Sequence, residues 1–112
     1  MKKILFTLVS FLALISLRSQ TVYSESSEAF ADVKVYVVSS EAFADLLVYK
    51  ESSEAFASGN VGKWYFEDSE AFASKKIYFE DSEAFADLKI YFVDSEAFAG
   101  WKNPDKKYLM EK

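Results

Sequence analysis

The stretch DLKIYFVDSEAFAG, residues 87–100, contains the unit from which the chain is built. Its segment Ser-Glu-Ala-Phe-Ala occurs six times, beginning at Ser27, Ser40, Ser53, Ser69, Ser82 and Ser95. The spacings between these serines are 13, 13, 16, 13 and 13 residues, so three extra residues separate two blocks of three units. The insertion falls in Ser58-Gly59-Asn60-Val61-Gly62, which we interpret as a loop. A fixed period of this kind predicts a repeat architecture.

A second column of residues fixes the register of the units. A tyrosine stands four residues before each serine, at Tyr23, Tyr36, Tyr49, Tyr65, Tyr78 and Tyr91. A large apolar residue precedes each tyrosine, at Val22, Val35, Val48, Trp64, Ile77 and Ile90. The segment KKIYFED, residues 75–81, is rich in β-branched and aromatic residues and alternates in character, which predicts a strand. Ile77 and Phe79 should face the core, while Lys76, Tyr78 and Glu80 take the opposite face. The sequence therefore predicts an all-β domain of six short-strand units of about 13 residues each.

The Ser-Glu-Ala-Phe-Ala segments permit two interpretations. The serine can cap a single helical turn, or the segment can form a short extended leg that returns from the strand. We favour the extended leg, because four or five residues do not sustain a helix alone. One unit cannot bury its own apolar face, but stacked units can. Stacking would make one internal aromatic row of Phe30, Phe43, Phe56, Phe72, Phe85 and Phe98.

The N-terminal residues have the pattern of a secretory signal peptide. Met1-Lys2-Lys3 is basic, residues 4–17 are mostly apolar, and Arg18-Ser19-Gln20 is polar. The apolar run is shorter than the roughly 20 residues that a membrane span needs. We therefore expect a signal peptide helix at 1–19 and a repeat domain at 20–112. The protein would be exported to the periplasm or the extracellular space, without stable membrane insertion after cleavage. A buried N-terminal helix or an uncleaved anchor is the alternative.

Composition excludes several kinds of chemistry. The chain has no cysteine and no histidine, which removes disulfides, cysteine-bound zinc and histidine acid–base catalysis. After cleavage, 10 basic and 18 acidic side chains would remain, a net charge of −8. Nucleic acids and anionic membranes need a basic surface, so neither is an expected partner.

Three stretches together resemble the septoil knot domain family of small bacterial proteins. These stretches are the unit DLKIYFVDSEAFAG, the mid-chain SGNVGKWYFEDSEAFA and the ending GWKNPDKKYLM. The resemblance covers roughly residues 20–112 and implies a chain that is knotted with seven crossings. It implies no activity, cofactor, partner or site residue. The ending departs from the repeat, and we expect it either to cap the last unit or to dock elsewhere.

The tyrosines that share a face with lysines and acids are the best candidates for surface contacts. With a tryptophan from the C-terminal segment, the candidates are Tyr36, Tyr49, Tyr65, Tyr78, Tyr91 and Trp101. Aromatic rings with polar tips suit an envelope or extracellular protein or a glycan as partner. The alternative is that neighbouring segments of the domain cover these rings.

The repeated acids suggest two other functions, which we consider weaker. Rows of carboxylates, such as Glu28 and its equivalents, can bind calcium, but these units lack the glycines that calcium loops interleave with acids. Lysine-paired surface acids are therefore the favoured interpretation, and no metal or cofactor is predicted. A hydrolase would need unique residues, of which Asn60, Lys102, Asn103 and Asp105 are the main ones. We predict no enzyme and no catalytic residue. The expected function is a structural or partner-binding repeat module.

Overall fold

The computed structural model describes residues 19–111, in which short strands alternate with 3₁₀ helices. The strands are β1 (Thr21–Ser24), β2 (Val33–Val37), β3 (Leu46–Lys50), β4 (Lys63–Phe66), β5 (Lys75–Phe79), β6 (Leu88–Phe92) and β7 (Gly100–Trp101). The 3₁₀ helices are η1 (Glu28–Phe30), η2 (Glu41–Phe43), η3 (Glu54–Phe56), η4 (Glu70–Phe72), η5 (Glu83–Phe85), η6 (Glu96–Phe98) and η7 (Pro104–Met110). The signal peptide predicted at 1–19 lies outside the described residues except for its last position.

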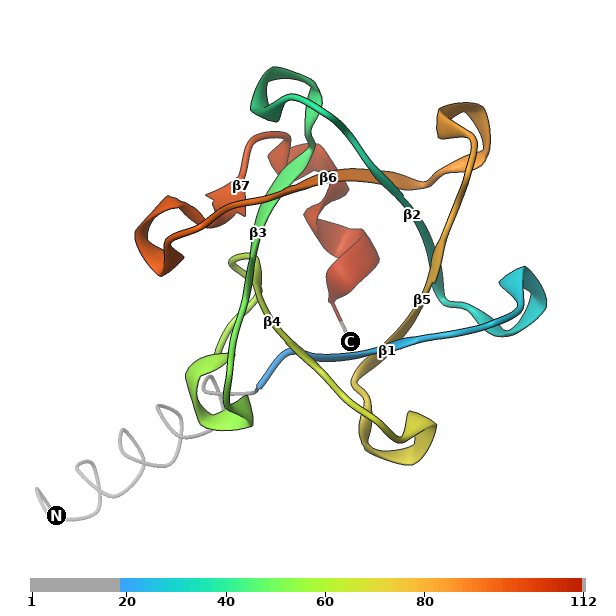
Figure 1. Ribbon diagram of the computed structural model, residues 1–112, viewed down its shortest axis with the longest axis vertical. Helices are drawn as coiled ribbons and strands as arrows, with labels where there is room; N and C mark the ends of the chain where they lie inside the picture. Colours follow the sequence, from blue (N-terminus) through green and yellow to red (C-terminus); the bar gives the residue numbers. More distant parts are fainter. Residues whose placement is uncertain (1–18, 112) are drawn as a thin grey trace, which may run out of the picture.

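Strands β1 to β6 form a closed parallel barrel, whose order around the ring is β4-β1-β5-β2-β6-β3, with β3 pairing back onto β4 (Figure 1). The chain therefore travels around the barrel twice. The first circuit places β1, β2 and β3 at alternate positions, and the second circuit fills the gaps with β4, β5 and β6. Within the described residues, each first-circuit strand pairs with strands of the second circuit and with no other of its own. The predicted all-β repeat domain is confirmed, and the two circuits hold each other together.

The core of the barrel is a ring of residues that precede the tyrosines. All six are fully buried at 0% exposure: Val22, Val35, Val48, Trp64, Ile77 and Ile90. Alternation turns these side chains inward and the tyrosines outward. Phe79, the second core residue predicted in its strand, packs against this cluster from a partly buried position. The inward face predicted from the alternating pattern is thus confirmed.

The Ser-Glu-Ala-Phe-Ala segments project outward as the corners of a six-pointed outline (Figure 1). The favoured extended leg was wrong, because each segment forms a 3₁₀ turn. The serine hydroxyl accepts a hydrogen bond from the alanine N–H two residues later at η1, η2, η3 and η6. This capping satisfies a donor that the start of a helix leaves free and so stabilises these four turns, although η4 and η5 form without it. The internal aromatic row was also wrong, because the turn carries every one of these phenylalanines to the surface.

Aspartates that follow three of the six Ser-Glu-Ala-Phe-Ala segments join the two circuits. Asp32, Asp45 and Asp87 each accept a hydrogen bond from a backbone N–H of a neighbouring strand, at 2.9 Å. The donors are the lysines at the second position of their strands, Lys76, Lys89 and Lys34. The backbone N–H of each aspartate in turn donates to the carbonyl of the same lysine, at 2.7–2.8 Å. Each of these aspartates therefore fixes a corner of one circuit to a strand of the other.

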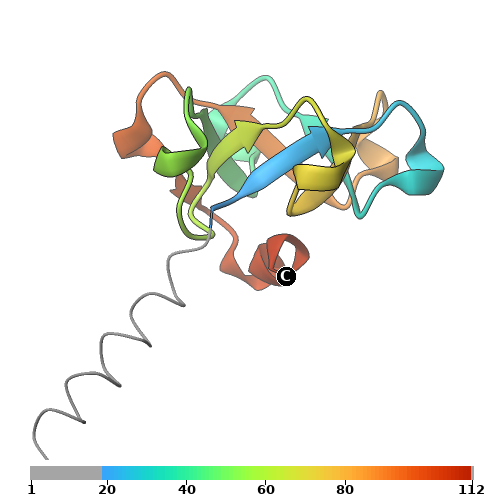
Figure 2. The same ribbon diagram turned by 90° about the horizontal axis from the view of Figure 1, so that it is seen from below.

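The C-terminal segment closes one end of the barrel. β7 pairs antiparallel with β3, and η7 lies beneath the end of the barrel at which β1 begins (Figures 1 and 2). Met110 is 2% exposed and belongs to the core cluster, and Leu109 packs against it. The Gln20 side chain, just before β1, donates to the Met110 carbonyl at 2.9 Å. Of the two expectations for this segment, the cap is the one observed.

Candidate functional site

The six corner phenylalanines are the most unusual feature of the surface. Their exposed fractions range from 59% for Phe56 to 72% for Phe72. Because the strands supply the core, the packing of the barrel does not require these rings. Single exposed apolar side chains are common on protein surfaces, whereas here an exposed ring recurs at the equivalent position of all six units.

Clefts lie between neighbouring corners, and three of them share one composition. We call these the corner clefts. The first, of about 670 Å³, is lined by Ser52, Ser53, Glu54, Tyr65, Glu67 and Phe72. The second, of about 340 Å³, is lined by Glu41, Tyr91, Phe92, Val93, Asp94 and Phe98. The third, of about 600 Å³, is lined by Tyr36, Val37, Val38, Ser39, Phe43 and Glu83. Each combines a strand tyrosine, the phenylalanine seven residues later, and a glutamate from a turn of the other circuit.

The predicted surface tyrosines thus occupy two kinds of position. Tyr36, Tyr65 and Tyr91 line corner clefts. Tyr49 and Tyr78 are half-buried at the equivalent positions of β3 and β5. Trp101 lies apart from the clefts: its ring packs against the core, and its indole N–H donates to the Asn60 carbonyl at 2.9 Å. Each corner cleft therefore contains one of the predicted tyrosines and brings no two of them together, while Trp101 connects the central loop to the C-terminal segment.

Carboxylates meet in pairs beside the corners. Four glutamates that follow the strands lie within hydrogen-bonding reach of a turn glutamate, in the pairs Glu25–Glu70, Glu51–Glu96, Glu67–Glu54 and Glu80–Glu28. The hydrogen bond to Glu70 is the main cause that raises the pKa of Glu25. Burial is the main cause that raises the pKa of Glu51, Glu67 and Glu80, and the paired carboxyl adds to it. Val38 and Val93 occupy the equivalent positions in the other two units.

Lysines form ion pairs with three of the six turn glutamates. Glu70, Glu83 and Glu96 form ion pairs with Lys76, Lys89 and Lys63 at 3.6, 3.6 and 3.7 Å. The expected lysine-paired surface acids are therefore present at three of the six turns. Among residues 19–111, no group of three or more acidic side chains is placed to hold a metal ion. The carboxylate pairs consequently give no support to a calcium site, which takes six to eight oxygen ligands.

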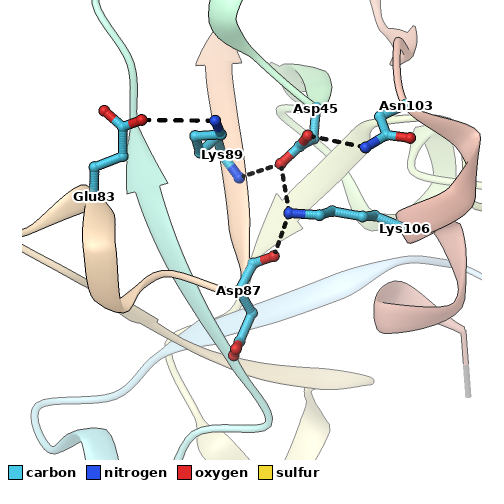
Figure 3. Close-up of polar contacts among 6 residues, drawn as sticks. All are labelled: Asp45, Glu83, Asp87, Lys89, Asn103 and Lys106. Carbon is cyan, nitrogen blue, oxygen red and sulfur yellow. Dashed lines mark hydrogen bonds and ion pairs between the residues drawn. The ribbon is translucent and has the colours of Figure 1, made fainter.

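A polar cluster around Asp45 anchors the C-terminal segment (Figure 3). Asp45 is buried, at 6% exposure. Its carboxylate accepts hydrogen bonds from the Lys89 backbone N–H at 2.9 Å and from the side chains of Asn103 and Lys106 at 3.3 Å. Lys106 also donates to the Asp87 carbonyl at 3.1 Å. These contacts are internal to the domain, so the cluster is a structural anchor.

Three of the four unique polar residues that a hydrolase would need make hydrogen bonds within the domain. Asn60 donates to the Lys107 carbonyl at 3.0 Å, and the Lys102 ammonium donates to the Glu41 carbonyl at 3.0 Å. Asn103 serves the Asp45 anchor, and Asp105 is an exposed residue of the first turn of η7. Asn60, Lys102 and Asn103 therefore join segments of the chain, and none of the four residues lines a corner cleft.

Sequence reasoning missed the corner phenylalanines as surface residues, because an apolar residue in a regular column usually marks a core. A signal was nonetheless present. Each phenylalanine lies between two alanines and shortly after a serine, which is a capped turn rather than an alternating strand. The strands already offered a complete apolar column in the residues before the tyrosines.

The interlaced parallel barrel, with one turn at each corner, defines a small all-β repeat domain. A model of the 7(1) septoil knot domain family matches residues 19–102. The chain belongs to this family, as the resemblance of its sequence predicted. Searches among curated proteins and among solved structures found no match. Within the described part of the chain, no helix has the length and apolar character that crossing a membrane requires.

Proposed function

We propose that the domain is a partner-binding module of the cell envelope or the extracellular space, and that it binds through its corners. The observation that carries this proposal is the exposure of all six corner phenylalanines, at 59–72%. The core of the barrel and its inter-circuit hydrogen bonds do not involve these rings. The rings are therefore available to a partner while the barrel holds the corners in place. Export rests on the N-terminal sequence pattern, and mass spectrometry of the secreted protein should find residues 1–19 removed.

The arrangement favours repeated weak contacts with one extended partner. Each corner cleft offers an aromatic wall and a carboxylate, which is a small area for a single interaction. A stable interface usually buries about 800 Å² on each partner, so several corners would have to act together. Linked contacts of this kind raise the overall affinity well above that of a single one.

Selection from a random peptide display library tests the proposal. Two variants serve as probes, one with serine at Phe30, Phe43 and Phe56, the other with serine at Phe72, Phe85 and Phe98. Because these rings are exposed, both variants should fold, which their melting curves will establish. Peptides selected on the unmodified protein should lose binding to at least one variant. Peptides that bind both variants as well as the unmodified protein would contradict the proposal. If the unmodified protein self-associates and either variant does not, the partner is a second copy of this chain and not a foreign protein.

A further inference from the structure

The corner cleft between η3 and η4 differs from the other two in the direct contact between its two acidic side chains. It contains the carboxyls of both Glu54 and Glu67, which lie within hydrogen-bonding reach of each other. In the other two clefts, the position of Glu67 is taken by Val38 or Val93. The Glu54–Glu67 cleft, as we name it, is also the largest of the three at about 670 Å³.

No lysine compensates the charge of this pair within the described residues. Lys76, Lys63 and Lys34 favour the ionised forms of Glu25, Glu51 and Glu80 and so offset part of the rise in the pKa of each. The pKa of Glu67 is raised by its burial, by the hydrogen bond and the charge of Glu54, and by the charge of Asp68. No lysine is among the groups that shift it. Among the described residues, neither Glu54 nor Glu67 forms an ion pair with a lysine, so the cleft holds two neighbouring carboxyls without a cation beside them.

The walls of the cleft suit an organic cation. Tyr65 and Phe72 line it, and Phe72 is the most exposed of the corner phenylalanines at 72%. Aromatic faces attract ammonium and guanidinium groups, more strongly when these are partly desolvated. The protein makes such contacts elsewhere, since the Lys50 ammonium lies 4.5 Å from the ring centroid of Phe92. A bare metal ion would find only two acidic side chains, whereas an alkylammonium would meet both aromatic walls and both carboxyls.

We propose that the Glu54–Glu67 cleft binds the ammonium or guanidinium group of a lysine- or arginine-rich segment of a partner protein. This inference rests on the proposed function, because it names the chemistry of the partner that the corners bind. The charge of the whole domain also favours a basic partner, because 10 basic and 18 acidic side chains follow residue 18 and give the domain a net negative charge. A basic segment would contact this cleft through its cation and neighbouring corners through its aliphatic stems.

The test measures the affinity of the purified protein for a short fluorescent peptide of lysine and glycine. Two matched peptides replace lysine by norleucine, which keeps the aliphatic chain without its charge, or by glutamate. The lysine peptide should bind, and higher salt should weaken it, while the other two peptides should not bind. Substituting Glu54→Gln together with Glu67→Gln should weaken binding by about tenfold, as expected for the loss of one desolvated cation contact.

A matched pair of substitutions controls for the general loss of charge. Glu28→Gln with Glu80→Gln removes an equivalent pair at a corner where Lys34 already supplies a positive charge. This control should change the affinity less than about twofold, well below the effect expected of a cation contact. Phe72→Ser should weaken binding without altering the fold. Removing like charges from the Glu54–Glu67 pair relieves repulsion, so weaker binding could not be attributed to unfolding.

Several results would overturn the inference. Failure of the lysine peptide to bind, equal binding of the norleucine peptide, or an equal loss with the control pair would each do so. If the norleucine peptide binds and Phe72→Ser abolishes it, the corners bind an apolar partner and the proposed function stands without the inference. If no peptide binds and the display selection yields only corner-independent peptides, both the inference and the proposed function fail.

Discussion

Replacing a corner phenylalanine should cost little stability, although the residue type suggests otherwise. Phe85 is 66% exposed, so only about a third of its surface is withdrawn from water. Full burial of a phenylalanine side chain contributes about 1.5–3 kcal/mol, and a third of that is about 0.5–1 kcal/mol. No cavity would form, because solvent already reaches the ring. Phe85→Ala should therefore lower the free energy of unfolding by no more than about 1 kcal/mol.

Ile77 provides the matched comparison from the core. It is 0% exposed in the ring of residues that precede the tyrosines, and Ile77→Ala should cost about 2–5 kcal/mol. Equilibrium unfolding in denaturant, followed from both directions until the curves coincide, measures both variants. A loss above about 2 kcal/mol for Phe85→Ala would contradict the exposed position of this ring, because it would mean that the ring is buried in solution.

Three further results are expected. Glu80→Gln should raise the melting temperature near pH 7.5 and hardly change it near pH 4. Because the pKa of Glu80 is raised in the folded state, the folded protein loses stability as the pH rises through that pKa, whereas glutamine cannot ionise. Thermal unfolding at both pH values measures the effect. Asp45→Ala should cost about 2–3 kcal/mol in denaturant unfolding, against about 1 kcal/mol for Asp32→Ala, because Asp45 also holds the C-terminal segment. The fragment 19–60 should show no cooperative melting by circular dichroism, since β1, β2 and β3 find their partners in the second circuit; a cooperative transition of the fragment alone would contradict the pairing.

The strands and the core could be predicted from the sequence because they follow a local rule. Alternation in KKIYFED assigns Ile77 to the inside and Tyr78 to the outside without any knowledge of neighbours. The order of the strands could not be predicted in this way. Thirteen residues allow a unit to stack on the next one, or to leave a gap that a later unit fills, and the local pattern is the same in both cases.

The candidate site was only half predictable, for a related reason. The tyrosine column identified Tyr36, Tyr65 and Tyr91 as surface residues, but the opposite wall of each cleft comes from a turn of the other circuit. The pairing of Glu67 with Glu54 therefore appears only when both circuits are in place. Phe72 was assigned to the core because hydrophobicity favours burial, whereas the barrel had already filled its interior with the residues before the tyrosines.

We propose that the strands hold the domain together while the repeated turns bind a partner. An amide chemical-shift map during titration with the lysine peptide tests it most directly. Saturable shifts should concentrate at Glu54, Tyr65, Glu67 and Phe72, and should spread to the other corners rather than to the strand interior. Shifts confined to the partly buried Phe66, Phe79 and Phe92 at the ends of β4, β5 and β6, or the absence of any saturable shift, would contradict it.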